Sequence, residues 1–235
     1  MFFCIKTRYP SFYARIIVKL KKRGGRFHMK DDLMTSIQKI ENNRPHVLGH
    51  KQFQSYSVLL PLIKINDDIH IIFEKRAEHL RRQPGEICFP GGRIEKGQED
   101  SQTAAIRETT EELLINKENI RLVGPLDFFV SSSDTIIYPF VGWIEKEFAE
   151  ISPNPEEVGE IFAVPISFLL KKKPEIHKIQ YIIEPEDNFP YHLIPDGKNY
   201  NWRPRSMKEY FYCYEDKVIW GMTARILNEF LENIE

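Results

Sequence analysis

Residues 55–73 contain two apolar, β-branched runs that are separated by a short polar turn. The first run is SYSVLLPLIKI, at positions 55–65, and the second covers positions 70–73. Between them stands Asn66-Asp67-Asp68, which is typical of tight turns because these side chains tolerate left-handed backbone. Apolar runs bounded by turn residues favour extended backbone. We therefore expect a strand, a turn and a second strand here, and with them a β-sheet.

Further strand-like and helix-like stretches follow without a regular alternation between the two. Asp100 or Ser101 can cap a helix that has a buried apolar stripe. We expect a short helix after Pro165 and an amphipathic helix at 220–234. The strand-like stretches are 120–123, 127–130, 136–143, 160–164, 179–183 and 210–214. This irregular order predicts an α/β (α+β) fold, with a mixed β-sheet flanked by helices, rather than a doubly wound parallel sheet.

The composition excludes several classes of partner. The 235-residue chain carries 33 Lys and Arg against 34 Asp and Glu, a net charge of −1, so no overall field favours nucleic acid or an anionic membrane. No apolar run approaches the roughly 20 residues of a membrane span, and the first residues lack the apolar core of a secretory signal. Cys4, Cys88 and Cys213 show no metal-ligand spacing. We expect a cytoplasmic protein without a membrane span or a nucleic-acid partner.

The first part of the chain differs from the rest in its charge. Residues 1–30 contain many Lys and Arg but no Asp or Glu, and a block of one charge sign usually marks a weakly ordered arm. We favour a poorly ordered or non-native extension, with Met29 or Met34 as the true start. A basic amphipathic anchor or a targeting segment is the alternative. We expect residues 1–28 to be an N-terminal extension and residues 29–235 to be a single domain.

Glu108, Glu111 and Glu112 are candidate metal ligands. On a helix they stand at positions i, i+3 and i+4, so all three project from one face over a single turn. Like charges at these spacings weaken a helix by about 0.2–0.5 kcal/mol each, and a bound cation would offset that cost. Mg²⁺ is usually held by one or two carboxylates together with substrate phosphates. The alternative is a solvated helix face, which is the commoner role of such a pattern.

Two neighbouring features favour a site over a solvated face. Arg107 stands one helical turn before Glu111, so the two side chains can pair and fix the direction of the carboxylate. Ahead of the helix, Phe89-Pro90-Gly91-Gly92 combines a rigid turn with two residues that lack a Cβ atom. The backbone there can approach a ligand or offer a carbonyl oxygen to a metal. The loop and the helix together predict a site.

The stretch 92–115, GRIEKGQEDSQTAAIRETTEELLI, resembles the Nudix box of pyrophosphohydrolases, and its REUxEE element falls at Arg107–Glu112. The resemblance implies a Nudix-like α/β/α sandwich, Mg²⁺ or Mn²⁺ as cofactor, and hydrolysis of a nucleoside diphosphate linked to another group. There are two departures. The spacing from Gly92 to Arg107 is one residue longer than in the common box. Leu114 stands where the box usually has glycine, which bears on how the helix ends.

The longer spacing is similar to that of the coenzyme A pyrophosphatase branch of the superfamily. The preceding stretch IFEKRAEHLRRQPGEICFPGG, at 72–92, also resembles the extended motif of that branch. The motif positions are held by Arg76, Ala77, Arg81, Gly85 and Phe89–Gly92. Weaker similarity continues through 154–165 and 219–227. The resemblance implies cleavage of coenzyme A, and also of its acyl or oxidised forms, to 3′,5′-ADP and 4′-phosphopantetheine.

The resemblance implies a role for each acidic residue of the helix. Glu108 and Glu112 are the expected principal metal ligands, and the backbone carbonyl of Gly91 or Gly92 is a further ligand. Glu111 is either a bridging ligand or the base that orients the attacking water. A divalent cation would neutralise the phosphate charges that otherwise repel this water.

Several residues are candidates for the catalytic base and for the substrate contacts. Besides Glu111, which Arg107 supports, Glu157 and Glu160 are alternative bases. Arg76 and Arg81 are candidate phosphate clamps, since a guanidinium forks onto two oxygens. The expected substrate-binding residues are Arg76, Arg81, Gly85, Phe89 and Gly91, although packing under the loop is the more natural role of Phe89.

Two other functions remain open. The first is a Nudix hydrolase of another nucleoside diphosphate derivative, such as a dinucleotide or a sugar nucleotide. The second is a non-catalytic, nucleotide-binding Nudix module, whose usual mark is the loss of a metal glutamate, and no such loss occurs here. A monomer and a homodimer are both compatible with the sequence.

Overall fold

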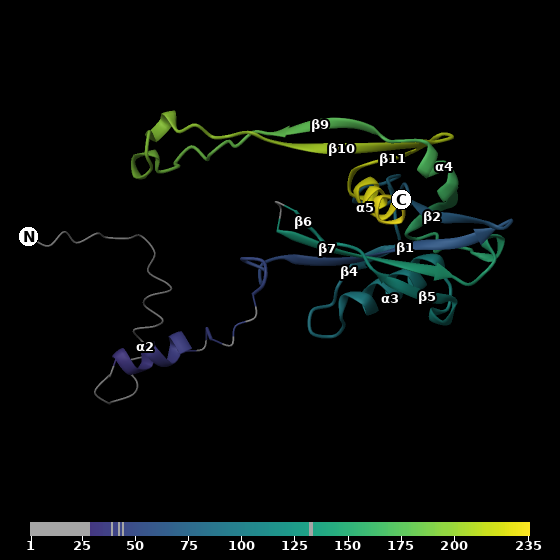
Figure 1. Ribbon diagram of the computed structural model, residues 1–235, viewed down its shortest axis with the longest axis horizontal. Helices are drawn as coiled ribbons and strands as arrows, with labels where there is room; N and C mark the ends of the chain where they lie inside the picture. Colours follow the sequence, from purple (N-terminus) through teal and green to yellow (C-terminus); the bar gives the residue numbers. More distant parts are fainter. Residues whose placement is uncertain (1–28, 39, 42, 44, 132–133) are drawn as a thin grey trace, which may run out of the picture. The chain divides into compact units, whose positions relative to one another are not determined.

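The computed structural model describes residues 29–38, 40–41, 43, 45–131 and 134–235. The predicted basic extension, residues 1–28, lies outside the described residues. The chain divides into two compact units, Met1–Leu48 and Gly49–Glu235, both drawn in Figure 1. In the first unit the structure describes one helix, α2 (Met29–Gln38), which the sequence pattern did not predict. The proposed domain start at residue 29 stays a prediction.

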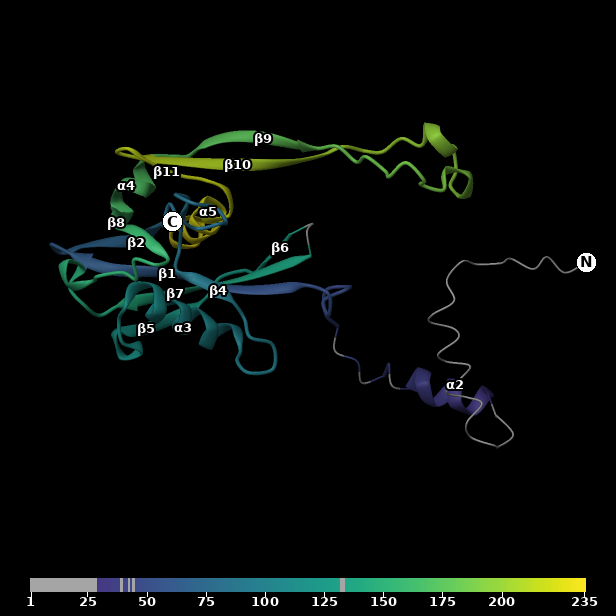
Figure 2. The same ribbon diagram turned by 180° about the vertical axis from the view of Figure 1, so that it is seen from behind.

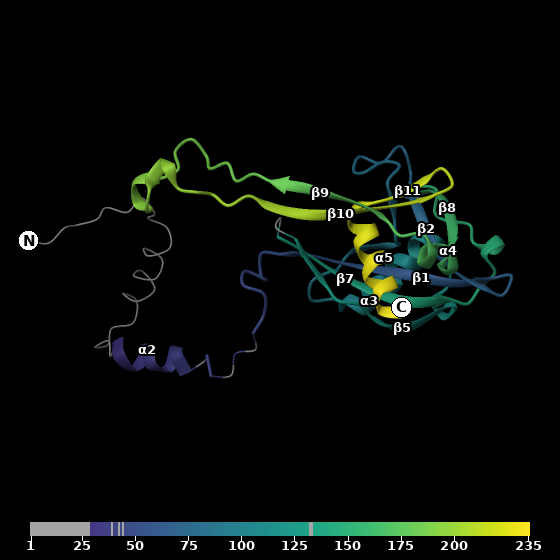
Figure 3. The same cartoon turned by 45° about the horizontal axis from the view of Figure 1, so that its top comes forward.

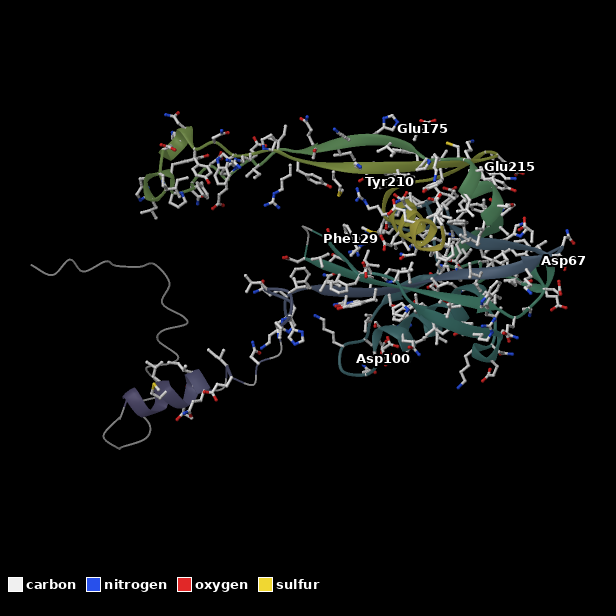
Figure 4. The ribbon with its side chains drawn as sticks, viewed as in Figure 1. Asp67, Asp100, Phe129, Glu175, Tyr210 and Glu215 are labelled. Atoms are coloured by element: carbon white, nitrogen blue, oxygen red, sulfur yellow. The ribbon has the colours of Figure 1, made fainter. Side chains whose placement is uncertain are left out.

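The second unit begins its sheet with the predicted strand, turn and strand. β1 (Gln54–Ile65) and β2 (Asp68–Arg76) pair antiparallel. Asn66 and Asp67 take φ angles of 48° and 64°, the left-handed values that a two-residue hairpin turn requires. Asn and Asp adopt this conformation more readily than most residues. Figure 4 labels Asp67 at this turn.

The main sheet has eight strands and mixes parallel with antiparallel pairs, which confirms the predicted mixed sheet. β1 lies between β2, its antiparallel partner, and β7 (Thr135–Ile144), its parallel partner. The other strands are β3 (Ile87–Cys88), β4 (Gly91–Arg93), β5 (Ile120–Pro125), β6 (Phe129–Ser131) and β8 (Val158–Pro165). β4 pairs with β1, so the glycine loop is hydrogen-bonded to a central strand.

Helices cover both faces of this sheet, as predicted. α3 (Ser101–Leu113) lies on one face and α5 (Gly221–Ile234) on the other (Figures 1 and 3). The side chains of β1 alternate between the two faces. The core on the α3 side includes Leu59, Ile63, Ile72, Ala105 and Leu113. The core on the α5 side includes Leu60, Leu62, Ile71, Leu227 and Phe230. The result is a helix–sheet–helix sandwich.

A three-stranded antiparallel sheet follows α4 (Ile166–Lys171), the short helix expected after Pro165. Its strands are β9 (Glu175–Tyr181), β10 (Arg205–Tyr214) and β11 (Lys217–Ile219). β9 and β10 run side by side in Figure 2. The expected strand at 179–183 is only partly right, because β9 begins at Glu175 and ends at Tyr181. Its pairing with 205–211 leaves Ile182 and Ile183 beyond the ladder.

Four short 3₁₀ turns complete the described elements. They span Lys117–Asn119, Phe148–Glu150, Tyr191–Leu193 and Gly197–Asn199. Across the described part of the chain, none of the helices has the length and apolar character needed to cross a membrane.

Candidate active site

Helix α3 begins where the sequence predicts and so presents its acidic residues at the sheet. The Asp100 carboxylate accepts a hydrogen bond from the Thr103 backbone N–H at 2.8 Å, which caps the helix and holds the pKa of Asp100 below its ordinary value. Figure 4 labels Asp100 at this end of α3. With the helix starting at Ser101, Glu108, Glu111 and Glu112 fall in its last turns.

The paired glycines allow the loop to approach both the sheet and the helix. A Cβ atom at Gly91 would overlap the Ser57 carbonyl oxygen and the backbone of Val58 on β1. A Cβ atom at Gly92 would overlap the carboxyl group of Glu108. Gly91 is therefore needed for strand pairing, and Gly92 leaves the space that the Glu108 carboxyl group occupies.

Glu112 points into the loop and is largely buried, with 5% of its surface exposed. Its Oε2 accepts a hydrogen bond from the Gly91 backbone N–H at 2.7 Å. Burial, together with the charges of Glu108 and Glu157, raises the pKa of Glu112 to about 8, against the opposing effects of the Gly91 hydrogen bond and Arg76. A buried carboxyl group of this kind takes up a proton unless a cation lies beside it.

Glu108 is half-buried, and burial raises the pKa of its carboxyl group, against the lowering effect of Arg107. The charges of Glu111 and Glu157 raise that pKa further. Glu157 lies in the loop before β8, and that loop is fixed to α3 because the Asn154 N–H donates to the Glu112 carbonyl oxygen at 2.8 Å. The structure thus brings Glu157 close enough to Glu108 and Glu112 to affect both electrostatically.

Arg107 connects the helix to the loop that precedes it. Its guanidinium contacts Glu99 Oε1 at 2.8 Å, Glu108 Oε1 at 2.8 Å and Glu111 Oε2 at 3.1 Å, and it donates to the Arg93 carbonyl oxygen at 3.2 Å. Glu99 and then Glu108 raise the pKa of Arg107, and Arg107 in turn lowers the pKa of Glu99. The predicted pairing of Arg107 with Glu111 is present.

Glu99 was missed by the sequence analysis. It stands eight residues before Arg107, in a polar loop where nothing in the local pattern distinguishes it from Glu95. Its side chain is only 8% exposed, and its Oε1 lies 2.8 Å from the Arg107 guanidinium. Only the folded loop, in which the Glu95 N–H also donates to Glu99 Oε1, brings this carboxylate to the guanidinium.

The expected substrate-binding residues differ in their exposure to solvent. Gly85 has a φ angle of +71° and donates from its N–H to the Arg76 carbonyl oxygen at 3.1 Å, which closes the loop that carries Arg81. Arg81 is exposed on that loop. The charge of Arg76 lowers the pKa of Glu112, so it lies beside the carboxylates. Phe89 is buried in the core, with its ring centroid 5.0 Å from that of Phe73.

Residues 59–184, more than half of the chain, match the family model described as the NUDIX domain. The chain belongs to the Nudix family. This confirms the resemblance that the glutamate helix and its glycine loop indicate. The Nudix match includes the hairpin, the loop, α3 and the strands that position them.

Two relatives and one solved structure are similar to this chain. The mouse protein described as peroxisomal coenzyme A diphosphatase NUDT7 is 29% identical over 169 residues, which cover 72% of this chain and 70% of that protein. Nudix hydrolase 3 of Caenorhabditis elegans is 30% identical over 211 residues, which cover 86% and 83%. Among solved structures, a complex of C. elegans Ap4A hydrolase is similar with a TM-score of 0.41 and 19% identity over 50% of this chain and 84% of that one.

A second carboxyl group that the sequence analysis missed lies behind the Nudix helix. Glu74, on β2, is 1% exposed, and its pKa is raised well above the ordinary value by burial and by the adjacent Glu112 carboxyl group. Cys88, its cross-strand partner on β3, also has a raised pKa because it is buried. The local pattern did not distinguish Glu74, because it directly follows the apolar run at 70–73 and precedes Lys75 and Arg76.

The chemistry of this cluster fits a hard divalent cation. Three carboxyl groups, those of Glu108, Glu112 and Glu157, act on one another electrostatically, and oxygen is the donor that Mg²⁺ and Mn²⁺ prefer. The absence of a Cβ at Gly92 leaves the Glu108 carboxyl group in contact with the loop backbone. As the described side chains stand, no three acidic, His or Cys residues converge closely enough to enclose an ion, and Arg107 pairs with Glu108 and Glu111.

Proposed function

We propose that this Nudix protein hydrolyses the pyrophosphate bond of coenzyme A, and also of acyl or oxidised coenzyme A, to give 3′,5′-ADP and 4′-phosphopantetheine. The observation that carries the proposal is the Glu108–Glu112 turn of α3 held against Gly91 and Gly92. Support for the substrate comes from the motif at 76–92 and from the mouse relative, whose name describes a coenzyme A diphosphatase.

Glu108 and Glu112 are the proposed ligands of Mg²⁺ or Mn²⁺, together with a backbone carbonyl of Gly91 or Gly92, and Glu111 is a further candidate. A divalent cation bound there supplies charge neutralisation at the diphosphate and lowers the pKa of a bound water. The protein's own part is to hold the carboxylates. The Gly91 N–H orients Glu112, and Arg107 orients Glu108 and Glu111.

Glu111 and Glu157 are the proposed alternatives for the base that orients the attacking water. Both side chains are exposed, so water can reach either. Glu157 acts on the charge of both proposed ligands, whereas Glu111 is tied to Arg107 at 3.1 Å. Glu160, on β8, is the third candidate. Its Oε2 lies 2.9 Å from Lys217 Nζ, so its charge is already paired and it is the weakest of the three.

Arg76 and Arg81 are the proposed clamps for the substrate phosphates. Arg76 lies beside the carboxylate cluster and suits the diphosphate. Arg81 is exposed on the loop that Gly85 closes, where it suits the 3′-phosphate of the adenosine. A guanidinium can bind such a group through two parallel hydrogen bonds.

The substrate is tested by a comparison of kcat/KM for coenzyme A, dephospho-coenzyme A, a dinucleotide and a sugar nucleotide. We expect coenzyme A to be preferred, and Arg81→Ala to reduce kcat/KM for coenzyme A by about tenfold while changing dephospho-coenzyme A little. Equal loss for both would contradict the clamp. Preference for the dinucleotide would replace the substrate but keep the metal chemistry, and binding without turnover would favour the non-catalytic module.

We also propose a cytoplasmic protein that acts as a monomer or a homodimer and binds no nucleic acid. The near-neutral net charge supports the last point. The mouse relative is described as peroxisomal, so fractionation of cells into cytosol and organelles, followed by sedimentation of the purified protein, tests both location and assembly.

A further inference from the structure

Glu74 occupies a position where a charged residue is unexpected. It lies in β2 between the strand's buried apolar residues and Lys75, and it is 1% exposed. Side chains alternate along a strand, so Glu74 shares the α3 face of the sheet with Ile72. A hydrocarbon side chain at this position would extend the core of that face. The carboxyl group therefore needs an explanation beyond packing.

The surroundings of Glu74 leave one of its oxygens without a partner. Its Oε1 is buried and makes no hydrogen bond with any described residue. Glu74 lies opposite Cys88 of β3, three residues before Gly91, whose N–H binds the Glu112 carboxyl group, and Glu112 is the acidic residue that acts most strongly on Glu74. Arg76 acts on Glu74 more weakly than burial and Glu112 do. An orphaned buried oxygen beside a second carboxyl group is the arrangement that a cation would complete.

Glu209 provides a contrast within the same chain. It is similarly buried, at 5% exposed, and its Oε2 also lacks a hydrogen-bond partner. However, its Oε1 pairs with Arg225 at 3.0 Å, so the charge is balanced by a side chain of the protein. The carboxyl group beside Glu74 is instead another glutamate, Glu112. Among the described residues, no Lys or Arg forms an ion pair with Glu74 or Glu112 that would balance their charges as Arg225 does for Glu209.

We infer that Glu74 is a fourth carboxylate of the divalent-metal site and contributes its charge to holding the cation behind Glu112. This inference rests on the proposed function, because it adds a residue to the same metal site. A bound divalent cation is the largest charge in such a site and stabilises the ionised form of nearby carboxyl groups. Adding a carboxylate to an oxygen-ligand site increases the affinity for the ion.

A purely positional role makes a different prediction. If Glu74 only hydrogen-bonds to Glu112 and orients it, Gln at this position keeps both the shape and a hydrogen-bond donor, and metal affinity is retained. If Glu74 contributes charge to the cation, Gln removes that charge and affinity falls. The Glu74→Gln variant therefore separates the two roles without a change in side-chain volume.

The test is a titration of Mn²⁺ into chelator-treated protein without substrate, followed by the electron paramagnetic resonance signal of free Mn²⁺. The variants are Glu74→Gln, Glu112→Gln and, as the matched buried control, Glu209→Gln. We expect Glu74→Gln to raise the Kd for Mn²⁺ by about tenfold or more, Glu112→Gln to raise it further, and Glu209→Gln to leave it unchanged. Thermal unfolding without metal checks that each variant is folded. If Glu74→Gln unfolds, Glu74→Asp replaces it; because this variant keeps the charge, we expect a Kd near the wild-type value, and a loss as large as that of Glu112→Gln would overturn the inference.

Unchanged Mn²⁺ affinity in folded Glu74→Gln would overturn the inference while leaving the site of Glu108 and Glu112 in place. An equal loss in Glu209→Gln would also overturn it, because the effect would then belong to any buried carboxylate. Wild-type protein that binds no Mn²⁺, or that binds it as well after Glu112→Gln, would instead remove the proposed metal site itself and the inference with it.

Discussion

The two helices that cover the main sheet serve different purposes. α5 buries Ala224, Ile226, Leu227, Phe230 and Leu231 against one face of the sheet. α3 buries two alanines, one leucine, Thr109 and the carboxyl group of Glu112 against the other. The smaller and more polar core under α3 leaves space for the glycine loop and the acidic cluster. We therefore expect the α5 face mainly to support stability and the α3 face, with its smaller apolar core, to hold the proposed site.

The sharpest test of this difference is Glu112→Gln on the α3 face. We expect hydrolysis to fall by about a hundredfold or more, since loss of a residue that only supports a metal ligand already costs 10–100-fold. The melting temperature of the metal-free variant should stay the same or rise, because a buried carboxyl group with a raised pKa is removed. Glu118→Gln, at an exposed position just after the helix, is the control. A large fall in melting temperature would contradict the division of roles.

Leu227→Ala should have the opposite effect on the α5 face. Leu227 is fully buried, and truncation of such a leucine typically costs about 2–5 kcal/mol in the free energy of unfolding. We expect kcat of the folded fraction to remain near the wild-type value. Urea denaturation and steady-state kinetics measure the two quantities, with Leu193→Ala, at a 72% exposed position, as the control. Loss of kcat in fully folded Leu227→Ala would show that packing on the α5 face also affects catalysis.

Gly92→Ala should affect activity at the α3 face more than it affects folding. The added Cβ atom overlaps the Glu108 carboxyl group, a side-chain end that can move aside. We expect at least about a tenfold loss of kcat/KM with a much smaller change in stability. Gly124→Ala is the matched control, because nothing lies within 4 Å of its added Cβ and its φ is not positive. Equal effects of the two substitutions would count against the glycine loop as part of the site.

The free energy of unfolding of the metal-free protein should depend on pH because Glu112, on α3, has a raised pKa. The pKa of Glu112 is about 8 in the folded protein, against about 4.3 in an unfolded chain. Between these values the unfolded state has lost the proton that the folded state keeps, so stability falls as pH rises from about 4.3 to about 8. Denaturation midpoints at pH 5 and pH 8 measure the slope. Glu112→Gln should reduce it but not abolish it, because Glu74 contributes in the same direction; an unchanged slope would refute the assignment.

The smallest expected effect is at the end of α3. Leu114 ends the helix with φ 50° and ψ 46°, a left-handed conformation that a leucine adopts at a cost of about 1–2 kcal/mol. Leu114→Gly should therefore raise the free energy of unfolding by up to about 1 kcal/mol, after allowance for the greater backbone freedom of glycine in the unfolded chain, and leave hydrolysis unchanged. A destabilised variant would show that the leucine side chain, although 57% exposed, contributes packing.

The sequence predicted those structural features that depend on residues close to one another in the chain. The Asn66-Asp67 turn, the Asp100 cap and the single face of Glu108, Glu111 and Glu112 each follow from residues within a few positions of one another. The structure adds that Leu114 still forms the left-handed exit that glycine normally provides. Helix periodicity likewise located α5 within a residue of its observed start.

Features that depend on distant partners were not predictable in the same way. Glu99 becomes important only when the loop brings it to Arg107. Glu74 becomes important only when β2 lies under α3 and next to Glu112. The position of β9 depends on its hydrogen bonds to β10, because every residue of β9 is exposed and its apolar pattern carries no burial signal.

The most direct test of the central claim is chromatography of coenzyme A after incubation with the purified protein and Mg²⁺ or Mn²⁺, beside Glu112→Gln. The account predicts 3′,5′-ADP and 4′-phosphopantetheine from the wild-type protein, and neither product from the variant or after addition of a chelator. Equal product formation by the wild type and Glu112→Gln would contradict the assignment of the α3 face as a metal-dependent hydrolysis site.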